Sequence, residues 1–200
     1  LISVLLVYLI TLELYNKKAA FISVISLISM PLWIQYSKYA SPDMAFVTCT
    51  LVSIYTLIKA FTSSKPHKHI FLFVCSFSLS IGFFLRSYMI LIPCISLSPY
   101  VFYNLKTDKV KSYIALILGF LIGLIPTFMN LYFDYEINSN NGLTTLFDFA
   151  RKQAIGSSII KNIYLLPVNL IYLTFPIGLI ILLLFLLTKS NNEVKNPLLI

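Results

Sequence analysis

The chain has 200 residues, of which 58% are hydrophobic and only 11% are charged, and its formal net charge is +8. A soluble globular domain carries about 25% charged residues. Long apolar segments recur along this chain, so the composition excludes a soluble domain and indicates a polytopic membrane protein. The basic residues lie in short segments between the apolar ones, a pattern that sets membrane orientation, so the positive charge does not indicate a nucleic-acid partner.

A helix needs about 20 apolar residues to cross the hydrocarbon core of a bilayer. The sequence therefore predicts an all-α bundle of membrane-spanning helices that forms a single transmembrane domain. The predicted spans are, in chain order, residues 1–12, 19–36, 43–61, 70–85, 87–103, 113–131 and 165–187. The chain begins inside an apolar segment, and another begins near Leu198, so we expect an internal part of a longer protein, truncated at both ends.

Residues 70–103 form an apolar segment that is too long for one span, and Arg86 interrupts it. The segments on both sides of it are basic and are expected to be cytoplasmic, so the number of crossings between them must be even. Two short spans with Arg86 at the outer tip satisfy this condition.

Ten of the fifteen Lys and Arg residues lie between the predicted spans or at the end of one, and are expected on the cytoplasmic side. These are Lys17, Lys18, Lys59, Lys65, Lys68, Lys106, Lys109, Lys111, Lys189 and Lys195. The other basic residues then lie outside, together with four of the seven acids. These are Lys38, Arg86, Arg151, Lys152 and Lys161, with Asp43, Asp134, Glu136 and Asp148. The sequence thus predicts that the functional charges gather at the outer face.

Residues 132–164 form the longest polar segment, which is predicted to be an outer loop. Within it, apolar residues recur at helical spacing over 144–155, which predicts an amphipathic helix on the membrane surface. Arg151 and Lys152 belong either to the polar face of this helix or to a phosphate-binding site.

Asp43 permits two interpretations. Ser41-Pro42-Asp43 is a good helix start, with Ser as the N-cap, Pro at the first position and an acid near the positive end of the helix dipole. Lys38 and Tyr39 lie only a few residues away, however, and an ionisable cluster at a membrane boundary tends to be paired and functional.

Arg86 also permits two interpretations. It is either a side chain that extends to water from the tip of a hairpin, or an anion clamp, because a guanidinium has donors that match the oxygens of a phosphate. His67 and His69 share one cytoplasmic segment, and two ligands without a third make a metal site there unfavourable.

The motifs of this chain resemble those of membrane-embedded glycosyltransferases of the C-type fold, in the group of the protein O-mannosyltransferases and the aminoarabinose transferases. In that group an aromatic and basic stretch is followed by an R-x-x-R-P-D-M-like element that opens a helix, and residues 38–44, KYASPDM, match it in part. SIGFFLRSYMILIP is similar to the hairpin G-L-A-F-L-T-K-G-P-V-x-L-L-L-P of the group, with Arg86 in place of its Lys. Pro126 is similar to the proline that opens the long outer loop, and NIYLLPVNLIYLTFPIG resembles the segment that re-enters the membrane.

The chain departs from the group at several of these positions. Thr127 follows Pro126 and Ile177 follows Pro176 where the group has Trp, and Ser87-Tyr88 replaces Gly-Pro in the hairpin. The first outer loop of the group, with its Asp-Glu pair, would lie upstream of Leu1.

The resemblance implies an enzyme that takes a sugar from a polyprenyl-phosphate donor and moves it to a lipid, protein or glycan acceptor at the outer face. Asp43 would be the catalytic residue of this chain, and would orient or deprotonate the acceptor or hold a divalent cation. Arg86, with Lys38 or Arg151, would hold the phosphate of the donor. The predicted substrate-binding residues are Lys38, Tyr39, Arg86, Tyr88, Arg151 and Lys152.

Two other classes of function remain open from the sequence. A transporter or flippase for a lipid-linked sugar would share the lipid partner, but transporters place charged or broken helices near the middle of the bilayer. A non-catalytic subunit of an envelope assembly would need no acids at the outer face. The abundance of Lys, Ile and Asn indicates an AT-rich genome and favours a bacterial inner membrane.

Overall fold

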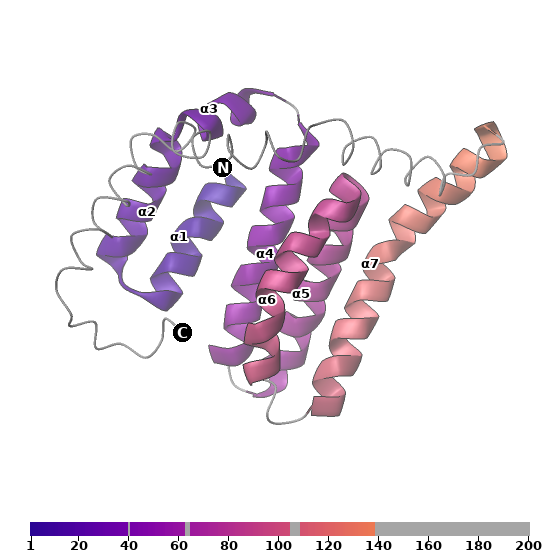
Figure 1. The fold of residues 1–200 in the computed structure, drawn as a ribbon. Coiled ribbons are helices and arrows are strands. Elements are labelled where there is room, and N and C mark those ends of the chain that lie inside the picture. The colour runs from indigo at the N-terminus through magenta and orange to yellow at the C-terminus, as the bar shows by residue number, and fades with distance from the viewer. Residues whose placement is uncertain (40, 63–64, 105–108, 139–200) are drawn as a thin grey trace, which may run out of the picture.

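The computed structural model describes residues 1–39, 41–62, 65–104 and 109–138. Within these ranges the chain is a bundle of helices (Figure 1). They are α1 (Ile2–Leu14), α2 (Lys17–Ser29), α3 (Pro31–Lys38), α4 (Pro42–Thr62), α5 (Lys65–Arg86), the short 3₁₀ helix η1 (Ser87–Ile90), α6 (Leu91–Asn104) and α7 (Lys109–Asn138). The predicted all-α membrane bundle is confirmed for the part of the chain that the structure describes.

The long helices lie side by side and alternate in direction along the chain (Figure 1). α4 and α5 are antiparallel neighbours, and Ser78 of α5 donates a hydrogen bond of 2.8 Å to the carbonyl oxygen of Cys49 in α4. α6 runs back along this pair, so that Tyr100 contacts Phe61 edge to face. α7 is parallel to α5 and packs closely against it. α1 packs on the other side of α4, through a hydrogen bond of 2.7 Å between Ser3 and Thr48.

Three helices in the described ranges, α4, α5 and α7, are long and apolar enough to cross a membrane. α2 and α3 together also pass this test, but they are bent by 66° at the break between them. The segment predicted as one span over 19–36 thus consists of two helices with a break at Met30. Met30 is extended, with a φ of −71° and a ψ of 124°, a conformation that the following Pro31 favours, so α3 turns away across one end of the bundle (Figure 1).

Two observed helix boundaries lie close to the predicted ones. α4 coincides closely with the segment predicted over 43–61. α5 ends at Arg86, and the chain reverses through η1 into α6, as predicted for a hairpin with Arg86 at its tip. Ser87, directly after this tip, has a φ of 44°. This left-handed conformation costs a residue with a side chain about 1–2 kcal/mol.

α7 differs from its prediction, because it continues through Pro126 to Asn138. Pro126 therefore does not open a loop, and Asp134 and Glu136 lie on a helix. A proline is tolerated inside a membrane helix because neighbouring groups can satisfy the backbone carbonyl that it leaves free. The predicted surface helix over 144–155 and the predicted span over 165–187 lie outside the described residues.

Among the described helices, α5 and α7 pack closely through small residues. A Cβ atom on Gly123 would lie 2.5 Å from Cβ of Ser80 and 2.8 Å from the carbonyl oxygen of Phe77. A Cβ atom on Gly119 would overlap Ser76 Oγ and the carbonyl oxygen of Phe73. Close approach through small residues is the usual way in which membrane helices gain van der Waals contact. Ser80 adds a hydrogen bond of 2.7 Å to the carbonyl oxygen of Phe120, which fixes α5 relative to α7.

Candidate functional site

The N-terminus of α4 places the Asp43 side chain at the end of the bundle that α3 crosses. Ser41 caps the helix, since its Oγ accepts a hydrogen bond of 3.2 Å from the backbone N–H of Asp43. The same hydroxyl donates a hydrogen bond of 2.8 Å to Asp43 Oδ2. The predicted helix start at Ser41-Pro42-Asp43 is thus confirmed, and its capping residue also holds the carboxylate.

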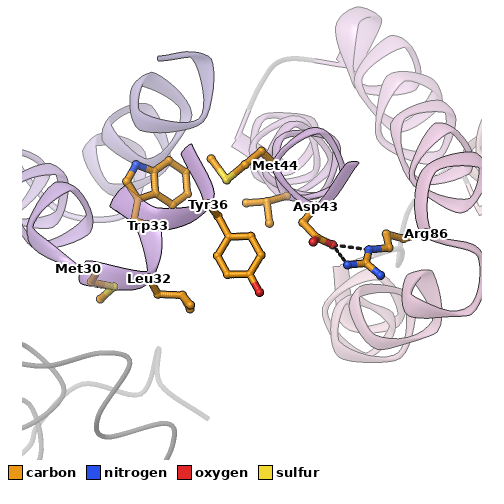
Figure 2. A pocket seen from close by; sticks show the side chains of 8 residues that line it. Met30, Leu32, Trp33, Tyr36, Asp43, Met44 and Arg86 are labelled. Atoms are coloured by element: carbon orange, nitrogen blue, oxygen red, sulfur yellow. Dashed lines mark hydrogen bonds and ion pairs between the residues drawn. The ribbon is translucent and has the colours of Figure 1, made fainter. Parts of the chain in front are cut away.

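Arg86 reaches Asp43 from the last residue of α5. Its Nε and Nη2 atoms both donate to Asp43 Oδ1, which makes an ion pair between residues that are 43 positions apart in the sequence (Figure 2). The pair is partly solvated, with 32% of the Arg86 side chain and 27% of the Asp43 side chain exposed. Asp43 lies near the positive end of one helix dipole and Arg86 near the negative end of another, so each charge is favourable where it lies.

A cavity of about 410 Å³ adjoins the ion pair. Three helices contribute to it, and the bend at Met30 brings α3 beside the start of α4. The lining residues are Met30, Leu32, Trp33 and Tyr36, then Asp43, Met44 and Val47 of α4, and Arg86 of α5. In Figure 2 the aromatic side chains of α3 lie on the side of the cavity opposite Arg86. The walls are therefore apolar and aromatic, and the ion pair supplies their charged groups.

Arg86 brings further hydrogen-bond donors to the site. A guanidinium has five N–H groups, and the contacts with Asp43 use one on Nε and one on Nη2. The others suit the oxygens of a phosphate, for which the forked geometry of arginine is well matched. The arrangement can bind a molecule with an anionic head and an apolar body.

The structure brings together two of the predicted site residues, Asp43 and Arg86. Lys38 and Tyr39 are exposed at the end of α3, and neither lines the cavity. Tyr88 lies in η1, but its side chain is outside the described part of the chain, as are Arg151 and Lys152. The roles predicted for these residues remain predictions.

Sequence reasoning missed Trp33 and Tyr36. Both belong to the apolar stretch PLWIQYSKY, where they read as part of a continuous span. The signal that could have found them is Met30-Pro31, because a proline ends the preceding helix and begins a new one.

The described residues contain no group of three His, Cys, Asp or Glu side chains that could hold a metal ion. Asp43 is the single carboxylate among the residues that line the cavity. Its oxygens are engaged by Arg86 and Ser41, so the described part of the site offers no ready ligand set for the divalent cation predicted as one option.

A second ion pair, between Glu13 of α1 and Lys59 of α4, lies at the opposite end of the bundle. Asp43 is in the first turn of α4 and Lys59 in its last turn, so the two pairs are about 24 Å apart along the helix axis. The lysines at the starts of α2, α5 and α7 lie at the same end as Lys59.

A comparison with protein families identifies the family of this chain. The model of the dolichyl-phosphate-mannose-protein mannosyltransferases matches residues 1–133. The chain belongs to this family. Membership implies a membrane glycosyltransferase that uses a polyprenyl-phosphate-linked sugar. The matched region, residues 1–133, includes the ion pair and the cavity. Neither the curated proteins nor the solved structures gave a significant match.

Proposed function

We propose that this member of the mannosyltransferase family transfers a sugar from a polyprenyl phosphate to a lipid, protein or glycan acceptor at the outer face of the membrane. The observation that carries the proposal is the apolar cavity with the Asp43–Arg86 pair at its wall. A polyprenyl-phosphate sugar has an anionic group between a long apolar chain and a polar sugar, so it matches a site where a guanidinium borders apolar walls.

The outer face is supported by the distribution of charge. The described helix starts at the Lys59 end carry Lys17, Lys18, Lys65, Lys68, Lys109 and Lys111. An excess of lysine marks the cytoplasmic side of a membrane protein. The cavity is at the other end of α4, and this supports the proposal that it opens at the outer face of a bacterial inner membrane.

In the proposed reaction the acceptor hydroxyl oxygen forms a bond to the anomeric carbon of the sugar and releases its proton to water, and the bond from that carbon to the phosphate oxygen breaks. The departing polyprenyl phosphate keeps the electron pair and gains negative charge, which Arg86 stabilises. A preorganised cation of this kind stabilises the charge that develops in the transition state. Such electrostatic stabilisation is usually the largest contribution that an active site makes to the reaction rate.

The test is a transfer assay on the full-length protein in membranes, with a radiolabelled polyprenyl-phosphate sugar and with Arg86→Ala beside the wild type. Release of label from the lipid by the wild type, and its loss in the variant, supports the proposal. Movement of intact labelled lipid across the bilayer without transfer would instead show a flippase. If the protein neither transfers the sugar nor moves the lipid, the remaining alternative is a non-catalytic subunit.

A further inference from the structure

The Asp43 carboxylate is more fully engaged than a proton-accepting group should be. Oδ1 accepts hydrogen bonds from Nε and Nη2 of Arg86, and Oδ2 accepts one from the Ser41 hydroxyl. A carboxylate has about four acceptor positions, so most of them are occupied before any acceptor hydroxyl arrives.

These contacts oppose a role as general base. Hydrogen bonds to the ionised form of a carboxylate, and a cation beside it, favour that form over the protonated one. An efficient base must accept a proton readily at the working pH and must lie within hydrogen-bond reach of the hydroxyl. Asp43 directs its oxygens to Ser41 and Arg86 instead.

The same contacts suit a role in positioning. Arg86 is the last residue of α5, directly before the left-handed Ser87, and about a third of its side chain is exposed. An arginine side chain of this kind loses considerable rotamer entropy when it is fixed by a ligand. Asp43 fixes it in advance, and Ser41 fixes Asp43 through both the backbone N–H and the carboxylate.

We propose that Ser41, Asp43 and Arg86 form a positioning relay, in which Asp43 acts through Arg86 and not on the acceptor. The relay holds the guanidinium at the cavity wall with its unused N–H groups free for the phosphate of the donor. The inference rests on the proposed function, because it assumes that the ligand of Arg86 is a polyprenyl phosphate. It replaces the catalytic role predicted for Asp43 from the sequence.

Binding of radiolabelled undecaprenyl phosphate to the full-length protein in detergent micelles tests the relay directly. Ser41→Gly removes the hydroxyl but keeps a residue that is tolerated at an N-cap, and Ser41→Thr restores a hydroxyl. Glu13→Gln removes the other ion pair and serves as the matched control. Melting temperatures of all variants show which of them remain folded.

We expect Asp43→Asn to weaken binding about tenfold, a loss typical for one charge-assisted hydrogen bond. Ser41→Gly weakens binding less, Ser41→Thr recovers the affinity that Ser41→Gly loses, and Glu13→Gln binds like the wild type. In transfer assays we expect Asp43→Asn to raise KM for the donor. The kcat at saturating donor should be unchanged, and the rate should still fall at low pH, in the acid limb of the pH–rate profile, as it does in the wild type.

Two results would overturn the relay. Unchanged or tighter binding by Asp43→Asn would mean that the carboxylate competes with the phosphate for Arg86. A fall in kcat at saturating donor, with loss of the acid limb, would make Asp43 the base after all. If the wild type binds no undecaprenyl phosphate and transfers no sugar, the proposed function fails and the relay with it, a pattern distinct from both.

Discussion

The two ends of α4 carry ion pairs that are alike in chemistry and differ in surroundings. Asp43–Arg86 joins α4 to α5, and Glu13–Lys59 joins α4 to α1, with the four side chains about equally exposed. The first pair borders an apolar cavity and is also held by Ser41, whereas Lys59 lies 6.0 Å from the ring centroid of Tyr55 in its own helix. Exposure and pairing alone do not distinguish a site from a surface contact, and the cavity and the additional hydrogen bond do.

The largest expected effect separates the two ends directly. Arg86→Ala removes the cation that we propose to stabilise the departing phosphate, so kcat/KM for sugar transfer should fall by about a hundredfold or more. Lys59→Ala removes a cation with similar exposure at the opposite end and should leave kcat/KM near the wild-type value. Equal losses in the two variants would show that the comparison is wrong and that both pairs act only on the fold.

The second prediction concerns the close contact between α5 and α7 at Gly119, which lies between the two ends of the bundle. Gly119→Leu forces a side chain against Ser76 and the carbonyl oxygen of Phe73, which cannot move far because it belongs to the backbone of α5. We expect a loss of about 1–3 kcal/mol in stability or a failure to fold, since overpacking strains a close contact. Ile117→Leu introduces the same side chain at an exposed position of α7 and should not lower the melting temperature.

The third prediction tests how much a partly exposed pair contributes on its own. Glu13→Gln should lower the free energy of unfolding by less than about 1 kcal/mol, because solvent screens the attraction between exposed charges. Sugar transfer should be unchanged, in contrast to Asp43→Asn. Chemical denaturation in detergent measures the first quantity, and a large loss of transfer in Glu13→Gln would contradict the assignment of this end as structural.

The smallest expected effect is at Ser87. Ser87→Gly removes about 1–2 kcal/mol of strain from a left-handed residue, but glycine also gives the unfolded chain about 0.5–1 kcal/mol of additional entropy. The variant should therefore be as stable as the wild type or about 1 kcal/mol more stable. Ser87→Val, with a branched side chain at a φ of 44°, should be clearly less stable, and similar melting temperatures for the two variants would refute the strain.

Local patterns predicted the parts of this molecule that depend on local physics. Ser41-Pro42-Asp43 specified the start of α4 because capping needs only neighbouring residues. A polar residue in the middle of 70–103, with basic segments on both sides, specified the hairpin at Arg86. The same approach missed the helix break at Pro31 and expected a helix end at Pro126, where α7 continues. A proline ends a helix in one context and lies within it in another.

The candidate site depended on distances that no local pattern contains. Asp43 and Arg86 were each identified, but their roles were assigned separately. Nothing in the sequence shows that the start of α4 meets the end of α5. Trp33 and Tyr36 were missed for a related reason. An apolar stretch looks the same whether it crosses a membrane or bends across the end of a bundle, and the 66° bend decides which side chains reach the cavity.

The Asp43–Arg86 pair also bears on how the protein is inserted into its membrane. In the proposed orientation both residues must cross the bilayer during biosynthesis, and a lone arginine at the centre of a membrane costs about 2.5–3.5 kcal/mol on insertion scales. Asp43 precedes Arg86 in the chain, so it is synthesised and inserted first, with Ser41 next to it to hold the carboxylate. The arginine that follows completes the α4–α5 hairpin by meeting its counter-ion, which would favour insertion of the two helices as one unit.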